Sequence, residues 1–351
     1  MTQTGPGDDG AAESTVAVSV VMLAYGDEPV LEEALAAVTS STGVRVEMVL
    51  VDNGCTRADV DDLCRRHGVR LLRPGSNLGF TGGVNLGVAA TTSPYVALVN
   101  SDAIVAPDAV KALQEVAADP GVGIASGSIR LAEDPTTMNS AGNPVHFLGL
   151  GWAGGLGEPA ARHALPRDVA AASGAGIVLR RSVWDALGGF PAEFFAYQED
   201  LELSWRCWQR GLAVRYVPGA VVVHHYEFSR NPLKMYLLER NRLLFVLTCY
   251  GRRTLMLLAP VLLAFEVAML VVAGLQGWGR KKVRGWGWVL SHLGWIRRRR
   301  QQVQAARTVP DADLVHLWAD RFTAAAMPLP RGAGVLQAAL AVYWSLVRRV
   351  L

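Results

Sequence analysis

Two carboxylates lie where the pattern of the chain changes, and both could do chemistry. Asp102 follows an apolar, β-rich run, YVALVNS at residues 95–101. A carboxylate at such a strand end, flanked by small polar residues, can bind a hard divalent cation that bridges two phosphates. Asp200 follows the aromatic cluster FFAY at 194–197 and falls in the first turn of an expected helix. The positive end of a helix favours the ionised carboxylate, which suits a general base for a hydroxyl. Each has a plainer interpretation as a cap or turn residue.

Three further features are candidates for ligand contacts. Asp52 ends an apolar run and precedes Asn-Gly, so it either hydrogen-bonds a base or ribose or closes an Asx turn. His224 ends the run AVVVH and is either an additional metal ligand or a structural histidine. The segment NLGFTGGVNLG at 77–87 lacks the GxGxxG order after a first strand, but its glycines suit a backbone close to a ligand. The alternative is a plain irregular loop.

The surrounding pattern predicts the elements that position these residues. Near-continuous apolar runs at 16–24, 46–52 and 95–101 are typical of strands buried on both faces. Between the first two, residues 28–41 place apolar side chains at helical spacing. Strand and helix in alternation predict an α/β fold with a mostly parallel sheet. Ligands of such sheets bind beyond the carboxyl ends of the strands, which is where Asp52 and Asp102 fall.

Composition separates the chain into two parts. It has 351 residues, of which 51% are hydrophobic and 19% charged, which excludes a disordered protein. Residues 1–230 carry 16 Lys/Arg and 26 Asp/Glu, whereas residues 231–351 carry 18 and 5. The second part is also apolar and rich in tryptophan, which favours a membrane surface over nucleic acid as its partner.

The apolar stretch at 255–276 has Glu266 as its only charged residue. Its length suffices to span about 30 Å of hydrocarbon. Glu266 and the basic residues that follow favour a re-entrant or interface-lying helix pair, with arginines (297–300) and tryptophans at the headgroups. The tryptophans concerned are Trp278, Trp286, Trp288 and Trp295. The alternative is a core helix of a soluble homo-oligomer.

The chain divides by these criteria into three parts. Residues 1–15 are polar and acidic, without a secretory signal, and are expected to form a disordered tail. Residues 16–230 form the α/β domain, and residues 231–351 form a basic, apolar, helical region associated with the membrane. Four cysteines without zinc spacing indicate reduced thiols. We therefore expect the protein on the cytoplasmic face of the cell membrane.

Taken in order, these segments resemble a family-2 glycosyltransferase of the GT-A type, particularly its rhamnosyltransferase-like members. The resemblance covers roughly residues 16–250. The segments that carry it are VSVVMLAYG, VLVDNG, NLGFTGGVNLG, LVNSDA, SGAGIVLRRSVWDALGGFPAEFFAYQEDLELSWR, VVVHHYEFSRN and LERNR. Each is weak alone, whereas the ordered set is specific.

The resemblance implies roles for single residues. Asp102 resembles the last carboxylate of the DxD motif, which here is Asn100-Ser101-Asp102 and lacks its first acid. Asp200 resembles the catalytic base of the ED motif, with Glu199 as its neighbour, and His224 resembles a late metal ligand. No role is assigned to His225. The implied nucleotide-sugar contacts are Ala24, Tyr25, Asp52, Asn77, Gly79, Asn85, Ser101 and Asp102.

The family implies an inverting transfer of a sugar from a UDP- or dTDP-linked donor, assisted by Mg²⁺ or Mn²⁺. The acceptor would be a hydroxyl of a membrane-linked or cell-envelope glycan. Two alternatives stay open. One is a nucleotidyltransferase, although the acidic AYGDEPVLEE after the first strand is a poor match. The other is a catalytically degenerate nucleotide-sugar-binding membrane scaffold, which the missing first acid would favour.

Overall fold

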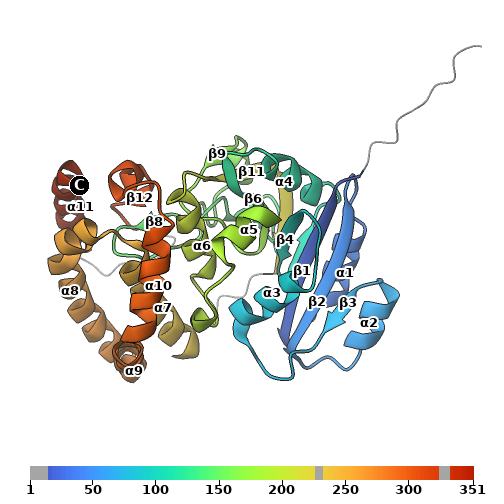
Figure 1. Cartoon of the computed structure of the whole chain (residues 1–351), viewed down its shortest axis with the longest axis horizontal. Coiled ribbons are helices and arrows are strands. Elements are labelled where there is room, and N and C mark those ends of the chain that lie inside the picture. Colours follow the sequence, from blue (N-terminus) through green and yellow to red (C-terminus); the bar gives the residue numbers. More distant parts are fainter. Residues whose placement is uncertain (1–14, 226–231, 324–332) are drawn as a thin grey trace, which may run out of the picture.

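A computed structural model of the chain describes residues 15–225, 232–323 and 333–351 (Figure 1). The expected tail at 1–15 therefore lies almost wholly outside the described residues. At the centre is a mixed ten-stranded sheet with the order β3-β2-β1-β4-β10-β6-β11-β5, to which β7 and β9 add at β6 and β11. Its strands are β1 (Ala17–Gly26), β2 (Arg45–Cys55), β3 (Arg70–Leu72), β4 (Tyr95–Val99), β5 (Ala103–Val105), β6 (Val122–Leu131), β7 (Met138–Ser140), β9 (Arg167–Asp168), β10 (Gly176–Arg180) and β11 (Ala213–His224).

The three expected strands, β1, β2 and β4, lie side by side in the sheet. β1 lies between β2 and β4 and runs parallel to both. The register pairs Ala24 with Asp52, so the carboxyl ends of β1 and β2 lie side by side. The sequence-based expectation of an α/β fold is confirmed, and the residues singled out at the strand ends share one edge of the sheet.

Helices cover both faces of the sheet. On one face the core joins β1 and β2 to α1 (Leu31–Thr39), α2 (Val60–Arg66) and α4 (Ala109–Ala117). Leu31, Leu35 and Val38 of α1 are fully buried there, as their helical spacing predicts. The other face packs against α3 (Gly79–Ala89), α5 (Arg181–Leu187) and α6 (Glu199–Trp208).

The glycine-rich segment is mostly a helix rather than the expected loop. In α3, a Cβ on Gly83 would lie 2.2 Å from the Leu23 Cδ1, and a Cβ on Gly87 would lie 2.4 Å from the Val21 Cγ1. Two of the glycines therefore allow the helix to lie close against the sheet. Helical propensity alone argues against glycine at these sites, so tertiary packing decides the structure.

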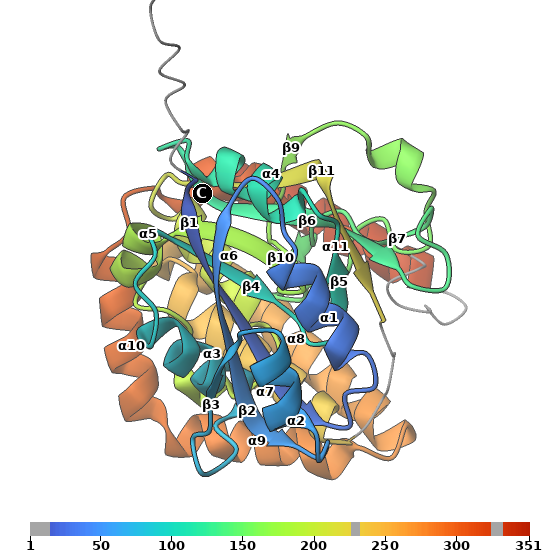
Figure 2. The same cartoon turned by 90° about the vertical axis from the view of Figure 1, so that its right-hand side faces the viewer.

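The C-terminal helices gather on the side of the molecule opposite to α1 and α2 (Figures 1 and 2). They share a hydrophobic core with the α/β part, in which Leu201 and Trp205 of α6 pack with residues such as Leu258, Leu314 and Trp344. The helices are α7 (Pro232–Cys249), α8 (Arg252–Leu275), α9 (Gly279–Ser291), α10 (Leu293–Ala305) and α11 (Ala333–Val350). Between α10 and α11 lies a 3-10 helix, Asp311–Leu317, followed by β12 (Trp318–Ala319), which pairs with β8 (Val145–His146).

The expectation that arginines 297–300 lie at lipid headgroups is wrong for two of them, because Arg299 pairs with Glu202 and Arg300 donates to the carbonyls of Leu247 and Tyr250. Other basic residues of the region are also held within the protein. α7 packs against α9 and α10, and Arg240 and Arg242 are buried. Lys282 is 1% exposed and lies 2.8 Å from the Glu266 Oε2. Trp286 donates a hydrogen bond to the same carboxylate oxygen, at 2.6 Å. Because Glu266 is paired within the protein, its charge does not meet a lipid phase alone.

The helix α8 presents an apolar surface to the outside. In the described part of the chain it is the helix that is long and apolar enough to cross a membrane, and 6% of its most apolar 18-residue window is buried. Its exposed side chains include Leu263 at 68% and Val267 at 64%. Such a continuous exposed apolar surface is typical of a contact with lipid or with another protein.

Candidate active site

The first part of the site is the edge where β1 and β2 end. Ala24 is buried and contributes backbone, while Tyr25 is 58% exposed beside it. Asp52 lies directly opposite Ala24 in the register. This edge lies at the carboxyl ends of parallel strands, which is where ligands of open α/β sheets bind.

Asp52 combines a turn role with an exposed charge pair. Its Oδ1 accepts hydrogen bonds from the backbone N–H groups of Gly54 (3.2 Å) and Cys55 (2.9 Å), which closes the Asx turn. Its Oδ2 accepts one from the Nε of Arg73 at 2.9 Å. Sequence analysis did not single out Arg73, because nothing in its neighbourhood distinguishes it from other surface arginines.

Glu28 joins the end of β1 to the Asn100-Ser101-Asp102 segment. Its Oε1 accepts hydrogen bonds from the Tyr25 N–H at 3.0 Å and from the Ser101 Oγ at 2.9 Å. Burial raises the pKa of Glu28, and the nearby charges of Asp102 and Asp27 raise it further, against the two hydrogen bonds. The sequence gives Glu28 only as an acidic residue at a helix start, so its contact with Ser101 could not be foreseen.

The structure brings Asp102 and His224 together, although 122 positions separate them. β11 pairs with β5, and the Nε2 of His224 lies 3.0 Å from the Asp102 Oδ1. The Nδ1 of His224 lies 3.2 Å from the Asn139 Oδ1 on β7. Both ring nitrogens thus face an oxygen, and a neutral imidazole has one N–H. A carboxylate oxygen and an imidazole nitrogen are ligands that a divalent metal accepts, whereas the described residues contain no group of three or more His, Cys, Asp or Glu that could hold a metal.

The asparagines of the glycine-rich segment are engaged within the protein. The Asn77 Oδ1 accepts hydrogen bonds from the Asn53 Nδ2 and from the Gly79 N–H, both at 2.8 Å. Asn85 bonds the backbone of Phe190 twice, with its Nδ2 donating to the carbonyl (2.8 Å) and its Oδ1 accepting from the N–H (3.0 Å). The Asn85 contacts hold α3 against the segment that leads to Asp200, a function that the glycine pattern did not indicate.

Asp200 lies in the first turn of α6, as the sequence predicts. Its Oδ1 accepts a hydrogen bond from the Leu201 N–H at 2.8 Å, and its Oδ2 accepts one from the Gly174 N–H at 3.1 Å. Burial raises the pKa of Asp200, while these two N–H groups oppose the shift. Burial and then the charge of Asp200 raise the pKa of Glu199 to about 8. Burial therefore disfavours the charge of both carboxyl groups, and their proximity in the first turn of α6 couples the two.

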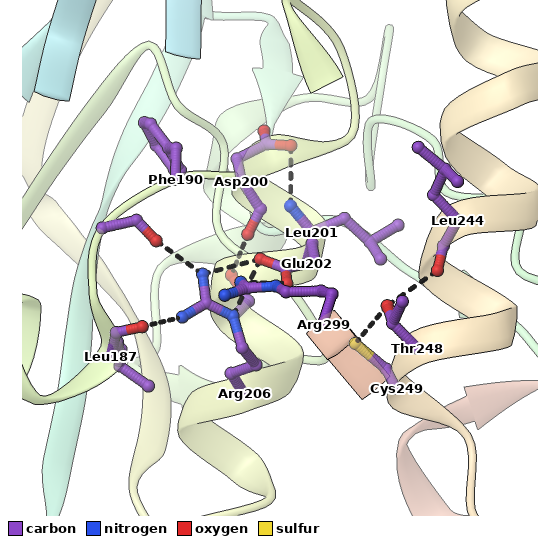
Figure 3. A network of polar contacts seen from close by, with 12 residues as sticks. Leu187, Phe190, Asp200, Leu201, Glu202, Arg206, Leu244, Thr248, Cys249 and Arg299 are labelled. Atoms are coloured by element: carbon purple, nitrogen blue, oxygen red, sulfur yellow. Dashed lines mark hydrogen bonds and ion pairs between the residues drawn. The ribbon is translucent and has the colours of Figure 1, made fainter. Parts of the chain in front are cut away.

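A buried cluster of charged side chains also holds α6 in place (Figure 3). Glu202 lies between two guanidinium groups, with the Arg206 Nη2 at 2.6 Å and the Arg299 Nη2 at 2.8 Å. Arg206 also donates to the carbonyls of Leu187 and Gly189 (2.5 and 2.7 Å). Arg299 belongs to α10, so the C-terminal region contributes directly to the support of the helix that carries Asp200.

The fold is similar to that of solved nucleotide-sugar enzymes. A structure of GalNAc-T7 with UDP, GalNAc and Mn²⁺ gives a TM-score of 0.54 at 15% identity, covering 68% of this chain and 49% of that one. The mannosyltransferase PcManGT from Pyrobaculum calidifontis, in complex with GDP-Man and Mn²⁺, gives 0.50 at 17% identity, covering 95% and 86%. The architecture is thus a GT-A fold with an added C-terminal helical region.

Relatives by sequence identify the family. The glycosyl transferase family 2 model matches residues 19–188. The N-acetylglucosaminyl-diphospho-decaprenol L-rhamnosyltransferase of Mycobacterium tuberculosis is 31% identical over 245 residues, which are 62% of this chain and 80% of the relative. The pre-mycofactocin glycosyltransferase of that organism is 29% identical over 192 residues, or 54% of this chain and 39% of the relative. The chain belongs to glycosyltransferase family 2.

Proposed function

We propose that the protein is an inverting glycosyltransferase that moves a sugar from a nucleotide diphosphate to a hydroxyl of a membrane-linked or cell-envelope glycan. The observation that carries the proposal is the position of Asp200 in the first turn of α6, where its two carboxyl oxygens accept hydrogen bonds from the backbone N–H groups of Leu201 and Gly174. A half-buried carboxylate at a helix start is suited to accept a proton from an acceptor hydroxyl.

The chemistry follows from one displacement. The acceptor oxygen attacks the anomeric carbon as Asp200 takes the hydroxyl proton, and the bond from that carbon to the diphosphate breaks. Because attack and departure occur on opposite faces, the configuration inverts. The step needs no covalent nucleophile.

The metal of this reaction would be held by Asp102 and His224, together with oxygens of the diphosphate. A divalent cation supplies charge compensation for the departing diphosphate. The protein offers a carboxylate and an imidazole at one point, with Asn139 orienting the ring. Two protein ligands suit Mg²⁺ or Mn²⁺, which are commonly held by one or two side chains and by substrate phosphates.

The donor and the acceptor follow from the residues and the relatives. Tyr25, Asp52 and Ser101 line the donor side, with the backbone of Ala24. The name of the rhamnosyltransferase relative supports a deoxyhexose as the donor sugar and a lipid-linked diphosphate glycan as the acceptor. That the donor carries UDP or dTDP is proposed from the family resemblance. The nucleotide contacts at Asn77, Gly79 and Asn85 are also proposed, with the backbone of α3 rather than the asparagine side chains facing the donor.

The membrane contact is proposed for the apolar side of α8. Leu263 and Val267 are exposed there, while Arg252 and Arg253 are exposed at the start of the helix. Basic residues beside an exposed apolar face suit the anionic cytoplasmic leaflet. Sedimentation with vesicles of anionic lipid tests this contact. The wild type should sediment, and a variant with Leu263→Asp and Val267→Asp should stay in the supernatant.

The test of the function is Asp200→Asn, measured against a panel of nucleotide sugars with Mn²⁺ and Mg²⁺. The amide keeps the shape but accepts no proton, so turnover should fall by about 10²–10⁴-fold. Donor affinity by calorimetry should change little. Asp185→Asn, an exposed aspartate on α5, is the matched control and should keep wild-type turnover. More than a tenth of wild-type turnover in Asp200→Asn would place the base elsewhere.

The missing first acid of the DxD motif favours one alternative, a nucleotide-sugar-binding membrane scaffold without catalysis. The same assay separates the two functions. A scaffold would bind a donor and show neither transfer nor hydrolysis in the wild type. An enzyme shows metal-dependent transfer that Asp200→Asn abolishes.

A further inference from the structure

The residues immediately before Glu199 form a turn with unusual backbone geometry. Phe195, Tyr197 and Gln198 have φ angles of 64°, 70° and 65°, and none of them is glycine. Residues with side chains seldom adopt positive φ, and they do so where surrounding contacts impose it. We call residues 194–198 the base turn. Its last residue, Gln198, accepts a hydrogen bond at its carbonyl from the Glu202 N–H, so the turn leads directly into α6.

The contacts that impose this geometry come mainly from Asn241 on α7. The fully buried Asn241 Nδ2 donates to three carbonyls of the base turn, those of Phe194 (2.9 Å), Ala196 (2.8 Å) and Tyr197 (2.8 Å). An NH₂ group has two hydrogens, so at least two of these carbonyls share one. The amide group of one side chain thus binds three backbone carbonyls of the same turn.

Arg240 fixes the orientation of that amide. Its Nε and Nη2 donate to the Asn241 Oδ1 at 3.0 and 2.9 Å. The Nη2 also donates to the carbonyls of Glu193 (2.7 Å) and Phe194 (2.8 Å). Because the amide oxygen faces the guanidinium, the NH₂ group faces the base turn.

The start of α3 holds the base turn from the other side. The Thr81 N–H donates to the Phe195 carbonyl at 3.1 Å. A Cβ on Gly79 would lie 2.4 Å from the same carbonyl oxygen, so this approach requires glycine. The base turn is therefore clamped between α3 and α7, two elements distant in the sequence.

We propose that Asn241 is a positioning residue for the reaction, which holds the base turn so that Asp200 meets the acceptor hydroxyl. The inference rests on the proposed function of Asp200. Asn241 lies outside hydrogen-bond contact with Asp200, so it acts through the backbone of residues 194–198. A displacement of about 1 Å at a reacting group can reduce the rate by about 10²-fold, and such a displacement follows when three carbonyls lose their common donor.

The experiment compares Asn241→Asp with Gln304→Glu. Asn241→Asp keeps the shape and replaces the donor by an acceptor that repels the three carbonyls. Gln304 is a matched control, since its Nε2 donates to two backbone carbonyls, of Thr248 and Cys249, away from the base turn. The readouts are kcat, the donor KM, the melting temperature, and hydrogen–deuterium exchange of peptides covering residues 190–204.

We expect Asn241→Asp to lower kcat at least tenfold, with the donor KM within about threefold and faster exchange over 190–204. Gln304→Glu should keep kcat within about twofold. A wild-type kcat in Asn241→Asp, or an equal loss in Gln304→Glu at an equal melting temperature, overturns the proposal. If Asn241→Asp does not fold, Asn241→Ser is measured instead, because its hydroxyl retains one donor without a charge.

The failure of the two proposals can be told apart. If the wild type transfers no sugar, the proposed function fails, and exchange over residues 190–204 still tests the clamp. If the wild type is active and Asn241→Asp equals it in kcat and exchange, the positioning role alone fails.

Discussion

Arg299 should be the residue through which the C-terminal region stabilises the catalytic helix. Its guanidinium lies 2.8 Å from the Glu202 Oε1, and the Glu202 side chain is 1% exposed. Removing one partner of a buried pair costs about 3–5 kcal/mol when the other charge is left alone. Here Arg206 remains at 2.6 Å. Arg299→Met should therefore lower the free energy of unfolding by about as much as the loss of one hydrogen bond to a charged group, about 1.5–3 kcal/mol.

The pH dependence of this loss has a definite sign. Burial alone would raise the pKa of Glu202, but the charges of Arg206 and Arg299 outweigh it and lower the pKa. A group with a lowered pKa stabilises the folded state above its unfolded pKa, about 4.3, and this stabilisation is lost as the pH falls through the folded value. Without Arg299 the folded pKa rises, so acid unfolding should begin at a higher pH.

Urea titration of the detergent-solubilised protein at pH 7 and at pH 4 to 5 measures both effects. Arg298→Met is the matched control, because Arg298 neighbours Arg299 and is exposed. Its free energy of unfolding should stay within about 0.5 kcal/mol of the wild type. If Arg299→Met is as stable as Arg298→Met, the pair with Glu202 contributes nothing to the free energy of unfolding.

Three further predictions concern the site and its support. Glu199→Gln should abolish the fall in kcat/KM that the wild type shows as the pH rises through about 8, because the amide mimics protonated Glu199; a pH profile in which both proteins decline together contradicts this. Asp102→Ala should weaken nucleoside diphosphate binding in the presence of Mn²⁺ and leave metal-free binding unchanged; calorimetry showing equal affinity with metal removes Asp102 from the metal site. Gly87→Ala should destabilise the fold by about 1–3 kcal/mol, because the added Cβ would lie 2.4 Å from the Val21 side chain. Gly287 has open space around it, so the control Gly287→Ala should stabilise α9 by about 0.5–1 kcal/mol. Equal melting temperatures of the two variants would exclude the packing explanation.

The parts of the fold that follow from chain-local patterns could be predicted. The parallel strands, α1 and the start of α6 each have a continuous periodic signal, and the strand ends then place Asp52 and Asp102 on one edge. The meeting of Asp102 with His224 agrees with the family resemblance. These features follow from the order of strands and helices along the chain, which can be recognised from the sequence.

The parts that depend on the docking of distant elements could not be predicted. Arg298 and Arg299 are adjacent arginines in one basic run, yet one is exposed and the other pairs with Glu202. Within a run of arginines, the sequence does not show which side chain will be paired and which will be exposed. Asn241 belongs to the LERNR segment of the resemblance, but that segment does not indicate its three acceptors, which lie more than 40 positions away.

The base turn has a consequence for attempts to make the enzyme more robust. Three non-glycine residues at positive φ each cost about 1–3 kcal/mol, which the clamp offsets. Glycine at position 197 or 198 would relieve that cost and raise the melting temperature while loosening the backbone before Asp200. A selection for heat resistance alone would therefore favour variants that survive longer and turn over more slowly, and a screen of this enzyme should score both properties together.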